Sequence, residues 1–319
     1  MKNKRLISIV VVNYNGKKYL ERSLPSFLNL NYPSKEIIVV DNGSTDGSVE
    51  YLSAIEKIKL IKSPRIREKN YACNLGVKEA KGDYIFLVDN DLVIDDAGLL
   101  DNLLDMYVSK DNAGIVNIAF KDEGKIFTTG YGNFLSLFPN NKKSVEYSKL
   151  KEVNGIKISF PSGIGIFVKK DFWNTLGGYN EKFIFGADDF DIGIRTWLLG
   201  KKCYLFSESV HLHIGNDSRK DKNELYFRYK NLILGRLSIL FQNLNFKNML
   251  INLITVFIYE FLHALKYTVK LRHYGPIYGY FVALGLFFLN LPDNIKDRRR
   301  IQSQRVVKKD IFLNIKSPF

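Results

Sequence analysis

The chain has 319 residues, which allow one large domain with an appendage or two domains. A hydrophobic fraction of 46% and a charged fraction of 25% are typical of a globular protein and argue against intrinsic disorder. The formal net charge of +14 indicates anionic partners, such as phosphates or an acidic membrane surface. The two cysteines, Cys73 and Cys203, have a spacing that suggests neither a disulfide framework nor a zinc site, which favours a reducing cytoplasm.

The first 120 residues alternate short apolar runs with amphipathic stretches. The apolar runs are ISIVVVNY, EIIVVDN, KIKLIKS, YIFLVDND and GIVNIAF, and stretches such as KKYLERSLPSFLNL and LLDNLLDMY separate them. The first run is too short for an export signal and lacks a cleavage site, so we interpret it as a strand. The alternation predicts an α/β fold, with a mostly parallel sheet and helices on both faces. In such sheets, ligands bind beyond the carboxyl ends of the strands.

Polar residues follow the first two predicted strands. Asn13 and Asn15 come after the first strand, and Asp41 ends the second, shortly before the turn GSTDGS. The small and polar residues of this turn let a ligand approach the backbone closely. A carboxylate in this place can accept hydrogen bonds from the base or ribose of a nucleotide. No glycine-rich phosphate-binding motif accompanies it, so the phosphates need another partner, such as a metal ion.

The fourth apolar run ends in two aspartates, Asp89 and Asp91, with Asn90 between them. On an extended chain, the two carboxylates fall on one side and Asn90 on the other. One or two carboxylates together with substrate phosphates are the usual ligands of Mg²⁺, and Mn²⁺ shares the preference for oxygen. The pattern therefore predicts a site for Mg²⁺ or Mn²⁺. The alternative is a turn in which Asp91 caps the next helix.

A second ordered block follows a polar, turn-rich stretch. It contains the predicted strand ISFPSGIGIFVKK and a predicted helix over residues 190–199, with Asp188 and Asp189 at the N-terminus of that helix. The helix dipole favours an ionised carboxylate there. Asp191 and Arg195 are four residues apart on the same helix and are expected to form an ion pair.

The last third of the chain changes character. Residues 248–267 form an amphipathic apolar segment, residues 275–292 are uncharged, and the basic cluster DNIKDRRRIQSQR follows. An uncharged segment of 18 residues is marginal for a membrane span, which needs about 20. We therefore interpret both segments as helices at a membrane interface, with arginines contacting anionic headgroups. The alternative is that they pack against the rest of the chain or a partner subunit. The predicted domains are an α/β catalytic domain, residues 1–240, and a membrane-associating part, residues 241–319.

A set of motifs resembles family 2 glycosyltransferases, which are inverting enzymes of GT-A fold that use a nucleotide-sugar donor. The motifs are VVNYNG, VVDNGSTDGS, NLGVKEAKGDYIFLVDNDL, LGGYNEKFIFGADDFDIGIR and HIGNDS, in the order and spacing of that family, within residues 5–235. A rhamnosyltransferase-like subgroup is one option. The resemblance implies a GT-A sheet, followed here by apolar and amphipathic C-terminal helices.

The resemblance also implies roles for individual residues. The catalytic pair is Asp188 with Asp189, of which the second is the base. The metal ligands are Asp91, the more direct one, with Asp89 and His213. The residues expected to bind the donor nucleotide are Asn13, Asn15, Asp41, Asn74 and Asp89. Gly163 and Trp173 are expected near the donor sugar or the acceptor, Gly163 because it leaves room beneath the backbone and Trp173 as an acceptor platform or a core residue.

Two further features of the pattern concern the diphosphate and the metal ion. Where the family often has a glycine, this chain has RIREKNYAC, so Arg65, Arg67 and Lys69 either touch the diphosphate or are solvated. His211 and His213 alternate on an extended stretch and therefore face opposite ways, so one of them is expected to contact the metal.

Together these features predict a metal-dependent, inverting glycosyltransferase. The acceptor is expected to be lipid-linked or a glycan, in the synthesis of cell-surface polysaccharide or glycoconjugate at the cytoplasmic face of the membrane. A homo-oligomer is left open, and nucleic acid is not an expected partner because the basic residues are scattered or lie beside apolar helices. One alternative is a nucleotidyltransferase, which the missing phosphate loop disfavours. Another is a non-catalytic, membrane-bound glycan-binding scaffold, which the intact aspartate motifs disfavour.

Overall fold

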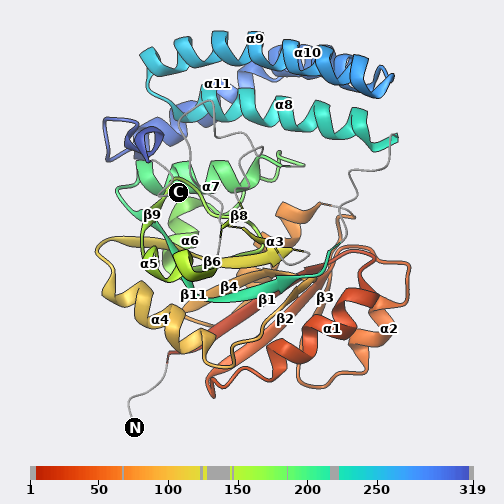
Figure 1. Cartoon of the computed structure of the whole chain (residues 1–319), viewed down its shortest axis with the longest axis vertical. Coiled ribbons are helices and arrows are strands. Elements are labelled where there is room, and N and C mark those ends of the chain that lie inside the picture. The colour runs from red at the N-terminus through yellow and green to blue at the C-terminus, as the bar shows by residue number, and fades with distance from the viewer. Residues whose placement is uncertain are drawn as a thin grey trace.

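The structure is a computed structural model that describes residues 5–66, 68–122, 125–127, 144–145, 147–184, 186–215 and 223–315 (Figure 1). The first block alternates strands and helices: β1 (Ile7–Asn13), α1 (Lys17–Leu28), β2 (Lys35–Asp41), α2 (Ser48–Ser53), β3 (Lys59–Lys62), α3 (Lys69–Glu79), β4 (Tyr84–Asp89), β5 (Leu92–Val93), α4 (Leu99–Ser109) and β6 (Ala113–Asp122). The second block contains β7 (Lys125–Phe127), β8 (Ser144–Val145), α5 (Tyr147–Glu152), β9 (Lys157–Ile158), β10 (Gly165–Lys169), α6 (Lys170–Leu176), α7 (Asp188–Leu198) and β11 (Lys202–His213). The C-terminal part is helical: α8 (Asn223–Asn243), α9 (Phe246–Leu271), α10 (Gly275–Leu289), α11 (Leu291–Gln304) and the 3₁₀ turn η4 (Ile311–Asn314).

A mixed sheet organises the α/β part, in the order β3-β2-β1-β4-β10-β6-β11-β5. β1 pairs in parallel with β2 and β4, in a register that places Asn13 beside Asp41 and Val12 beside Asp89. β10 is antiparallel to β4 and β6, whereas β11 is parallel to β6. The polar residues that end β1, β2 and β4 therefore lie side by side at one edge of the sheet.

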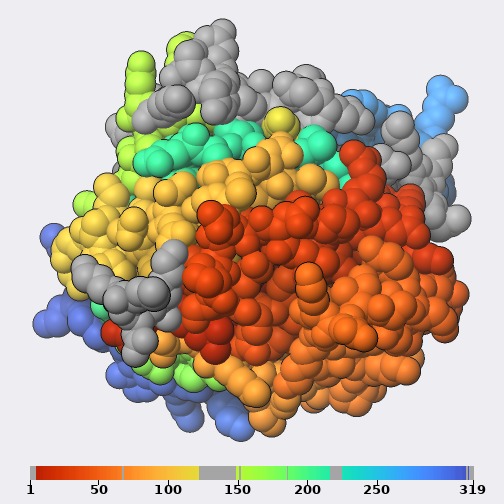
Figure 2. Space-filling model, turned by 90° about the horizontal axis from the view of Figure 1, so that it is seen from below, coloured from red at the N-terminus to blue at the C-terminus, as the bar shows by residue number. Residues whose placement is uncertain are grey.

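Helices cover both faces of the sheet because its strands are apolar on both sides. In β1, Ile9 and Val11 belong to the core that includes Leu24 of α1, whereas Val10 belongs to the core that includes Val77 of α3. Helices α1, α2 and α4 lie on one face, and α3, α6 and α7 lie on the other (Figure 1). Figure 2 views the molecule from below, where the segments coloured red to yellow, from β1 to α4, form most of the visible face. The predicted α/β architecture is confirmed.

Helices α8 to α11 pack on one another, and α8 also packs on α7. Helices α9 and α10 form the layer farthest from the sheet (Figure 1). An ion pair between Arg236 of α8 and Glu260 of α9 is buried inside this helical unit. Residue 240, the predicted boundary between the two domains, lies within α8. As packed, the helical unit begins with α8, because this helix contacts α9, α10 and α11 along with α7.

A buried ion pair fixes α7 to its surroundings. Arg195 Nε and Nη2 donate to Asp191 Oδ2 at 2.8 and 2.5 Å, as the spacing of these residues predicts. Arg195 also donates to the carbonyl oxygens of Leu176 and Gly178, at 2.6 and 2.8 Å. Asn243 of α8 donates to the other carboxylate oxygen of Asp191 at 3.3 Å. These bonds hold α7 against α8 and against the start of the loop that follows α6.

Replacing Arg195 with methionine is expected to destabilise the protein by about 3–5 kcal/mol, because the Asp191 carboxylate stays buried without its counter-charge. Urea unfolding of Arg195→Met measures this loss. Lys59→Met is the matched control, since the Lys59–Glu79 pair at 2.8 Å is exposed and its loss costs at most about 1 kcal/mol. Equal losses for the two variants contradict the role assigned to the buried pair.

Candidate active site

Asn13 links three chain segments at the carboxyl edge of the sheet. Its side chain is completely buried. Nδ2 donates to Asp41 Oδ1 and to Ser44 Oγ, both at 3.1 Å, and Oδ1 accepts from Nδ2 of Asn90 at 2.6 Å. Gly16 makes room for this contact, because a Cβ at residue 16 would lie 2.0 Å from Asn90 Nδ2. The segments after β1, β2 and β4 are thereby fixed relative to one another. These contacts engage both polar atoms of Asn13, and its predicted contact with the donor stays a prediction.

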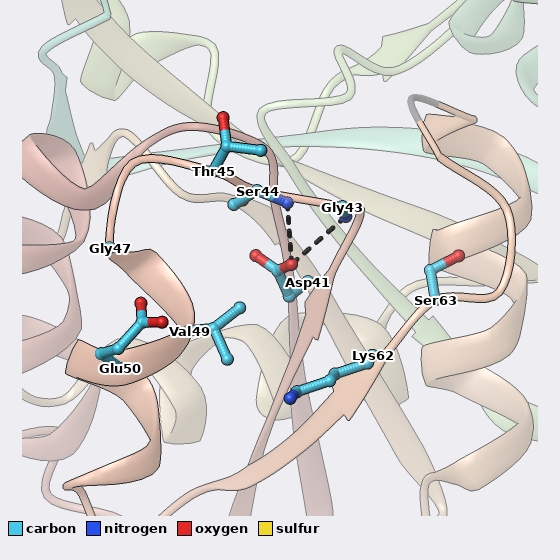
Figure 3. Close-up of a pocket in the computed structure, with 9 residues that line it drawn as sticks. All are labelled: Asp41, Gly43, Ser44, Thr45, Gly47, Val49, Glu50, Lys62 and Ser63. Atoms are coloured by element: carbon cyan, nitrogen blue, oxygen red, sulfur yellow. Dashed lines mark hydrogen bonds between the residues drawn. The ribbon is translucent and has the colours of Figure 1, made fainter.

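Asp41 and the turn after it line a cavity of about 500 Å³ (Figure 3). Asp41 Oδ2 accepts from the backbone N–H groups of Gly43 and Ser44, at 3.2 and 3.0 Å. Lys62, at the end of β3, and Glu50 of α2 also line the cavity (Figure 3). The walls combine an open backbone turn with carboxylates and an amine. This lining suits a polar, flat group such as a nucleotide base.

Two other residues predicted to bind the donor contact the backbone. Asn15 has a φ of 47°, and its Oδ1 accepts from the N–H of Thr45 at 2.7 Å. Asn74 Oδ1 accepts from the N–H of Tyr179, and its Nδ2 donates to the carbonyl oxygen of Tyr179, both at 2.9 Å. These asparagines hold the turn after β2 and the loop after α6. A contact with the donor stays a prediction for both.

Asp91 and His213 are brought together by the pairing of β5 with the end of β11. His213 Nε2 lies 3.3 Å from Asp91 Oδ2. Asp91 Oδ1 is buried and has no hydrogen-bond partner among the described residues. The backbone of Gly215 passes close by, and a Cβ there would lie 2.1 Å from Asp91 Oδ2. His211 is fully buried, with its Nε2 3.2 Å from Ser209 Oγ, so the two histidines face different surroundings, as their alternation predicts.

The Asp91–His213 pair fits a divalent cation. An unsatisfied carboxylate oxygen suits Mg²⁺ and Mn²⁺, and Mn²⁺ also accepts an imidazole nitrogen. Among the residues that the structure describes, no group of three or more His, Cys, Asp or Glu side chains is arranged to hold a metal ion. A cation at this pair would therefore take its remaining ligands from a diphosphate or from water, as is usual for sites with few carboxylates.

Lys69 lies among the aspartates of the site. Its Nζ is 2.8 Å from Asp89 Oδ1. Burial lowers the pKa of Lys69, but the charges of Asp89, Asp188 and Asp189 outweigh burial and hold that pKa well above its usual value. The sequence leaves two options open for Lys69, solvation and a contact with the diphosphate. The structure supports neither directly, because Lys69 forms an ion pair with Asp89.

The neighbouring arginines differ from Lys69. Arg65 Nη1 lies 3.0 Å from a carboxylate oxygen of Glu181, and its guanidinium lies 4.0 Å from the centre of the Tyr71 ring. The first contact ties Arg65 to the loop after α6, and the second ties it to α3. Arg67 lies outside the described residues.

Asp188 and Asp189 both lie in the first turn of α7, as predicted. Burial, together with the charge of Asp188, raises the pKa of Asp189 to about 8, although Lys69 acts in the opposite direction. Two effects therefore oppose each other at Asp189: the helix dipole favours the ionised carboxylate, whereas burial and the charge of Asp188 favour the protonated form. Gly163 makes room for it, because a Cβ at residue 163 would lie 2.7 Å from Asp189 Oδ1.

Trp173 is a core residue. It is 2% exposed, and its ring packs edge-on against Tyr179 with 5.0 Å between the ring centres. Of the two interpretations of Trp173, core residue and acceptor platform, the structure supports the first. A side chain buried to this extent offers no face to an acceptor.

Asn117 of β6 is a positioning residue that no motif marks. Its Oδ1 accepts from the N–H of Ser162 at 2.9 Å, and its Nδ2 donates to the carbonyl oxygens of Ser162 and Gly165 at 2.9 and 2.5 Å. The loop with Gly163 is thereby held against Asp189. The signal that could have revealed Asn117 is an asparagine inside the apolar run GIVNIAF, because a buried amide needs partners.

Known proteins resemble the chain over part of its length. The family model described as "Glycosyl transferase family 2" matches residues 8–174. An uncharacterized glycosyltransferase of Haemophilus influenzae is 34% identical over 160 residues, which are 49% of this chain and 61% of that protein. A poly-beta-1,6-N-acetyl-D-glucosamine synthase of Staphylococcus epidermidis is 37% identical over 93 residues, which are 28% of this chain and 23% of that protein. The chain thus spans less than two thirds of the length of either relative.

A solved structure shares the fold over nearly the whole chain. The mannosyltransferase PcManGT from Pyrobaculum calidifontis, in complex with GDP-Man and Mn²⁺, has a TM-score of 0.58 at 16% identity, covering 98% of this chain and 86% of that one. The likeness extends to the C-terminal helices, because almost all of the chain is covered. It supports the predicted fold.

Asp189→Asn is expected to make the unfolding temperature less dependent on pH. The pKa of Asp189 is raised to about 8 in the folded protein. Between about pH 4 and about pH 8 this residue therefore ionises in the unfolded chain but not in the folded protein, and the free energy of unfolding falls as the pH rises. Asparagine does not ionise, and the variant should therefore gain on the order of 5 °C over the wild type between about pH 5 and about pH 9. Thermal melting across this range measures the effect, with Asp171→Asn at an exposed aspartate as the control. Parallel pH curves for Asp189→Asn and wild type contradict the raised pKa.

Proposed function

The chain belongs to glycosyl transferase family 2, and on this premise we propose that it transfers a sugar from a nucleotide-sugar donor to a hydroxyl group, with Mg²⁺ or Mn²⁺ and with inversion at the anomeric carbon. The observation that carries this proposal is the grouping of the Asp91–His213 pair and Asp189 at the sheet edge that also carries the cavity beside Asp41. Asn13 connects the cavity to residues 89–91, called the D-N-D segment, and Lys69 connects Asp89 to the start of α7.

The proposed donor lies along this edge. Its base enters the cavity beside Asp41, and its diphosphate extends toward Asp91 and His213, which hold the metal ion with Asp89 nearby. The complex of the fold relative PcManGT with GDP-Man and Mn²⁺ supports a nucleotide-sugar and a divalent cation as the ligands. When bound, the metal supplies positive charge that stabilises the departing nucleoside diphosphate.

Asp189 is the proposed catalytic base. It takes the proton of the acceptor hydroxyl while that oxygen forms a bond to the anomeric carbon, and the bond from this carbon to the diphosphate breaks. A single displacement of this kind inverts the configuration. A pKa raised to about 8 makes the carboxylate a stronger base than an exposed aspartate, which suits proton transfer near neutral pH. Lys69 favours the ionised form of Asp189 through its charge.

The proposed acceptor is a glycan or a lipid-linked molecule in the synthesis of cell-surface polysaccharide or glycoconjugate. The similarity to the poly-beta-1,6-N-acetyl-D-glucosamine synthase of S. epidermidis supports this class of acceptor. The protein is proposed to act at the cytoplasmic face of the membrane, with residues 1–240 as the catalytic domain and the later helices as its attachment. A homo-oligomer and a rhamnosyltransferase-like specificity stay predictions.

Asp189→Asn is expected to slow transfer by about 10²–10⁴-fold while donor affinity stays within about twofold, because the variant keeps the shape of the site but accepts no proton. Release of nucleoside diphosphate in the presence of Mn²⁺ measures the rate, and isothermal titration measures the affinity. Asp171→Asn makes the same substitution at an exposed position of α6 and should keep full activity. Full transfer by Asp189→Asn would remove Asp189 as the base.

Asp91→Asn and His213→Gln are each expected to weaken Mn²⁺-dependent binding of a nucleoside diphosphate by at least about tenfold, since each removes one protein ligand. Titration with UDP and with GDP at a fixed Mn²⁺ concentration tests this. Asp95→Asn, at a half-exposed aspartate that pairs with Lys121, serves as the control. A chelator should stop transfer by the wild type, and added Mn²⁺ should restore it. Undiminished binding in both variants speaks against the proposed metal site.

A further inference from the structure

The outer side of α9 is an apolar stripe. This helix has 26 residues and is therefore about 39 Å long at about 1.5 Å per residue. Its inner side packs on α8 and α10. Its outer side exposes apolar residues at helical spacing, including Leu250, Ile254, Ile258, Leu262 and Val269. A soluble surface rarely leaves so long an apolar stripe without a partner.

The charged residues exposed along α9 are lysines. Lys247 lies at one end of the stripe, and Lys266 and Lys270 lie near the other. Glu260, the acidic residue of this helix, is buried in its ion pair with Arg236. The exposed side of α9 therefore combines apolar side chains with positive charge at both ends.

α10 extends the apolar stripe into a broader surface. It contains no charged residue, and its exposed side chains include Tyr278, Phe281 and Phe288. The rings of Phe261 and Phe281 lie 6.4 Å apart, so the exposed stripes of α9 and α10 adjoin. We call the exposed apolar residues of these two helices the α9–α10 face. It belongs to the layer farthest from the sheet (Figure 1).

α9 is long and apolar enough to cross a membrane, and α10 with α11 would do so only as a pair bent by 67°. Crossing would require α9 to leave α8. Glu260 and Arg236, whose side chains are 2% and 9% exposed, would then lose each other, and Glu260 would enter hydrocarbon, where a charge is costly. The packing of the helices therefore favours a position on the membrane over a position across it.

We propose that the α9–α10 face binds flat to a bilayer with anionic headgroups, with α9 in the plane of the interface. The apolar side chains enter the boundary between headgroups and acyl chains, and the lysines contact headgroup phosphates. This inference rests on the membrane location within the proposed function. It adds which surface binds the membrane and how α9 is oriented relative to the bilayer. Because α8 packs on both α7 and the outer helices, the face is joined to the helix of Asp188 and Asp189.

Charge favours a lipid surface over a second copy of the chain. Each chain carries a net charge of +14, and the charged residues exposed on α9 are lysines. Two such faces in contact would bring like charges together, whereas an anionic bilayer neutralises them. The occupant that fits both the apolar stripe and its lysines is therefore an anionic membrane.

The test is co-sedimentation of the full chain with vesicles of phosphatidylcholine, with or without phosphatidylglycerol. The wild type should bind the anionic vesicles, and the binding should weaken as salt increases. Ile254→Glu combined with Ile258→Glu should lower binding at least about tenfold, because both carboxylates would enter the apolar boundary. Val108→Glu, at an exposed apolar residue of α4, is the matched control and should bind like the wild type.

If the double glutamate variant melts at a lower temperature than the wild type, a second variant tests the same face without placing charge among its apolar residues. Lys266→Gln combined with Lys270→Gln should remove most of the preference for anionic vesicles. Vesicle binding needs no donor, metal or turnover. A protein that does not bind vesicles can therefore still transfer a sugar, and the proposed function would stand. A protein that binds vesicles without transferring a sugar would leave the proposed membrane surface intact.

Several results would overturn the proposal. Equal vesicle binding by the double glutamate variant and the wild type excludes this face. Retention of the wild type in vesicles after alkaline carbonate extraction indicates a helix that crosses the membrane. A dimer in solution that the glutamates dissociate, with vesicle binding unchanged, assigns the face to a second copy of the chain.

Discussion

Crowded negative charge at one edge of the sheet is the constraint on which the rest of the site depends. Asp89, Asp188 and Asp189 lie around Lys69, and Asp91 lies against His213. One lysine does not balance these carboxylates, which are partly buried, and the pKa of Asp189 rises to about 8 because of burial and of the neighbouring charge. Such costly groupings are typical of functional sites, where a ligand relieves the strain. A nucleoside diphosphate that arrives with a divalent cation has the charge distribution to do so.

The surrounding fold keeps the carboxylates in this arrangement. The buried amide of Asn13 bonds to Asp41 at the end of β2 and to Asn90 after β4. The segments that follow β1, β2 and β4 are therefore fixed relative to one another. On the other side, the Asp191–Arg195 pair fixes α7 to the loop after α6, and Asn243 joins α7 to the C-terminal helices. The helices that carry the exposed apolar face are therefore connected by direct packing and hydrogen bonds to the helix that starts with the proposed base. The proposed membrane-binding face and the proposed catalytic base are therefore linked by direct contacts.

Local pattern was sufficient to predict the fold and part of the site. Continuous apolar runs marked the strands, and the i,i+4 spacing of Asp191 and Arg195 correctly predicted their ion pair. Contacts between distant segments left no such pattern. Asn74 is predicted to bind the donor nucleotide, and its contact with the backbone of Tyr179, in a loop more than one hundred residues away, had no signal in the sequence. The pairing of Lys69 with an aspartate and the raised pKa of Asp189 depend on burial, which the tertiary structure alone determines.

The proposed metal site makes a specific claim about the surroundings of bound Mn²⁺. Electron spin-echo modulation on the protein with Mn²⁺ and a nucleoside diphosphate tests it most directly. The expected spectrum shows phosphorus coupling from the diphosphate together with nitrogen coupling from a single imidazole, and His213→Gln removes the nitrogen coupling while the phosphorus coupling persists. Phosphorus coupling without any nitrogen coupling in the wild type would contradict the placement of the cation between Asp91 and His213.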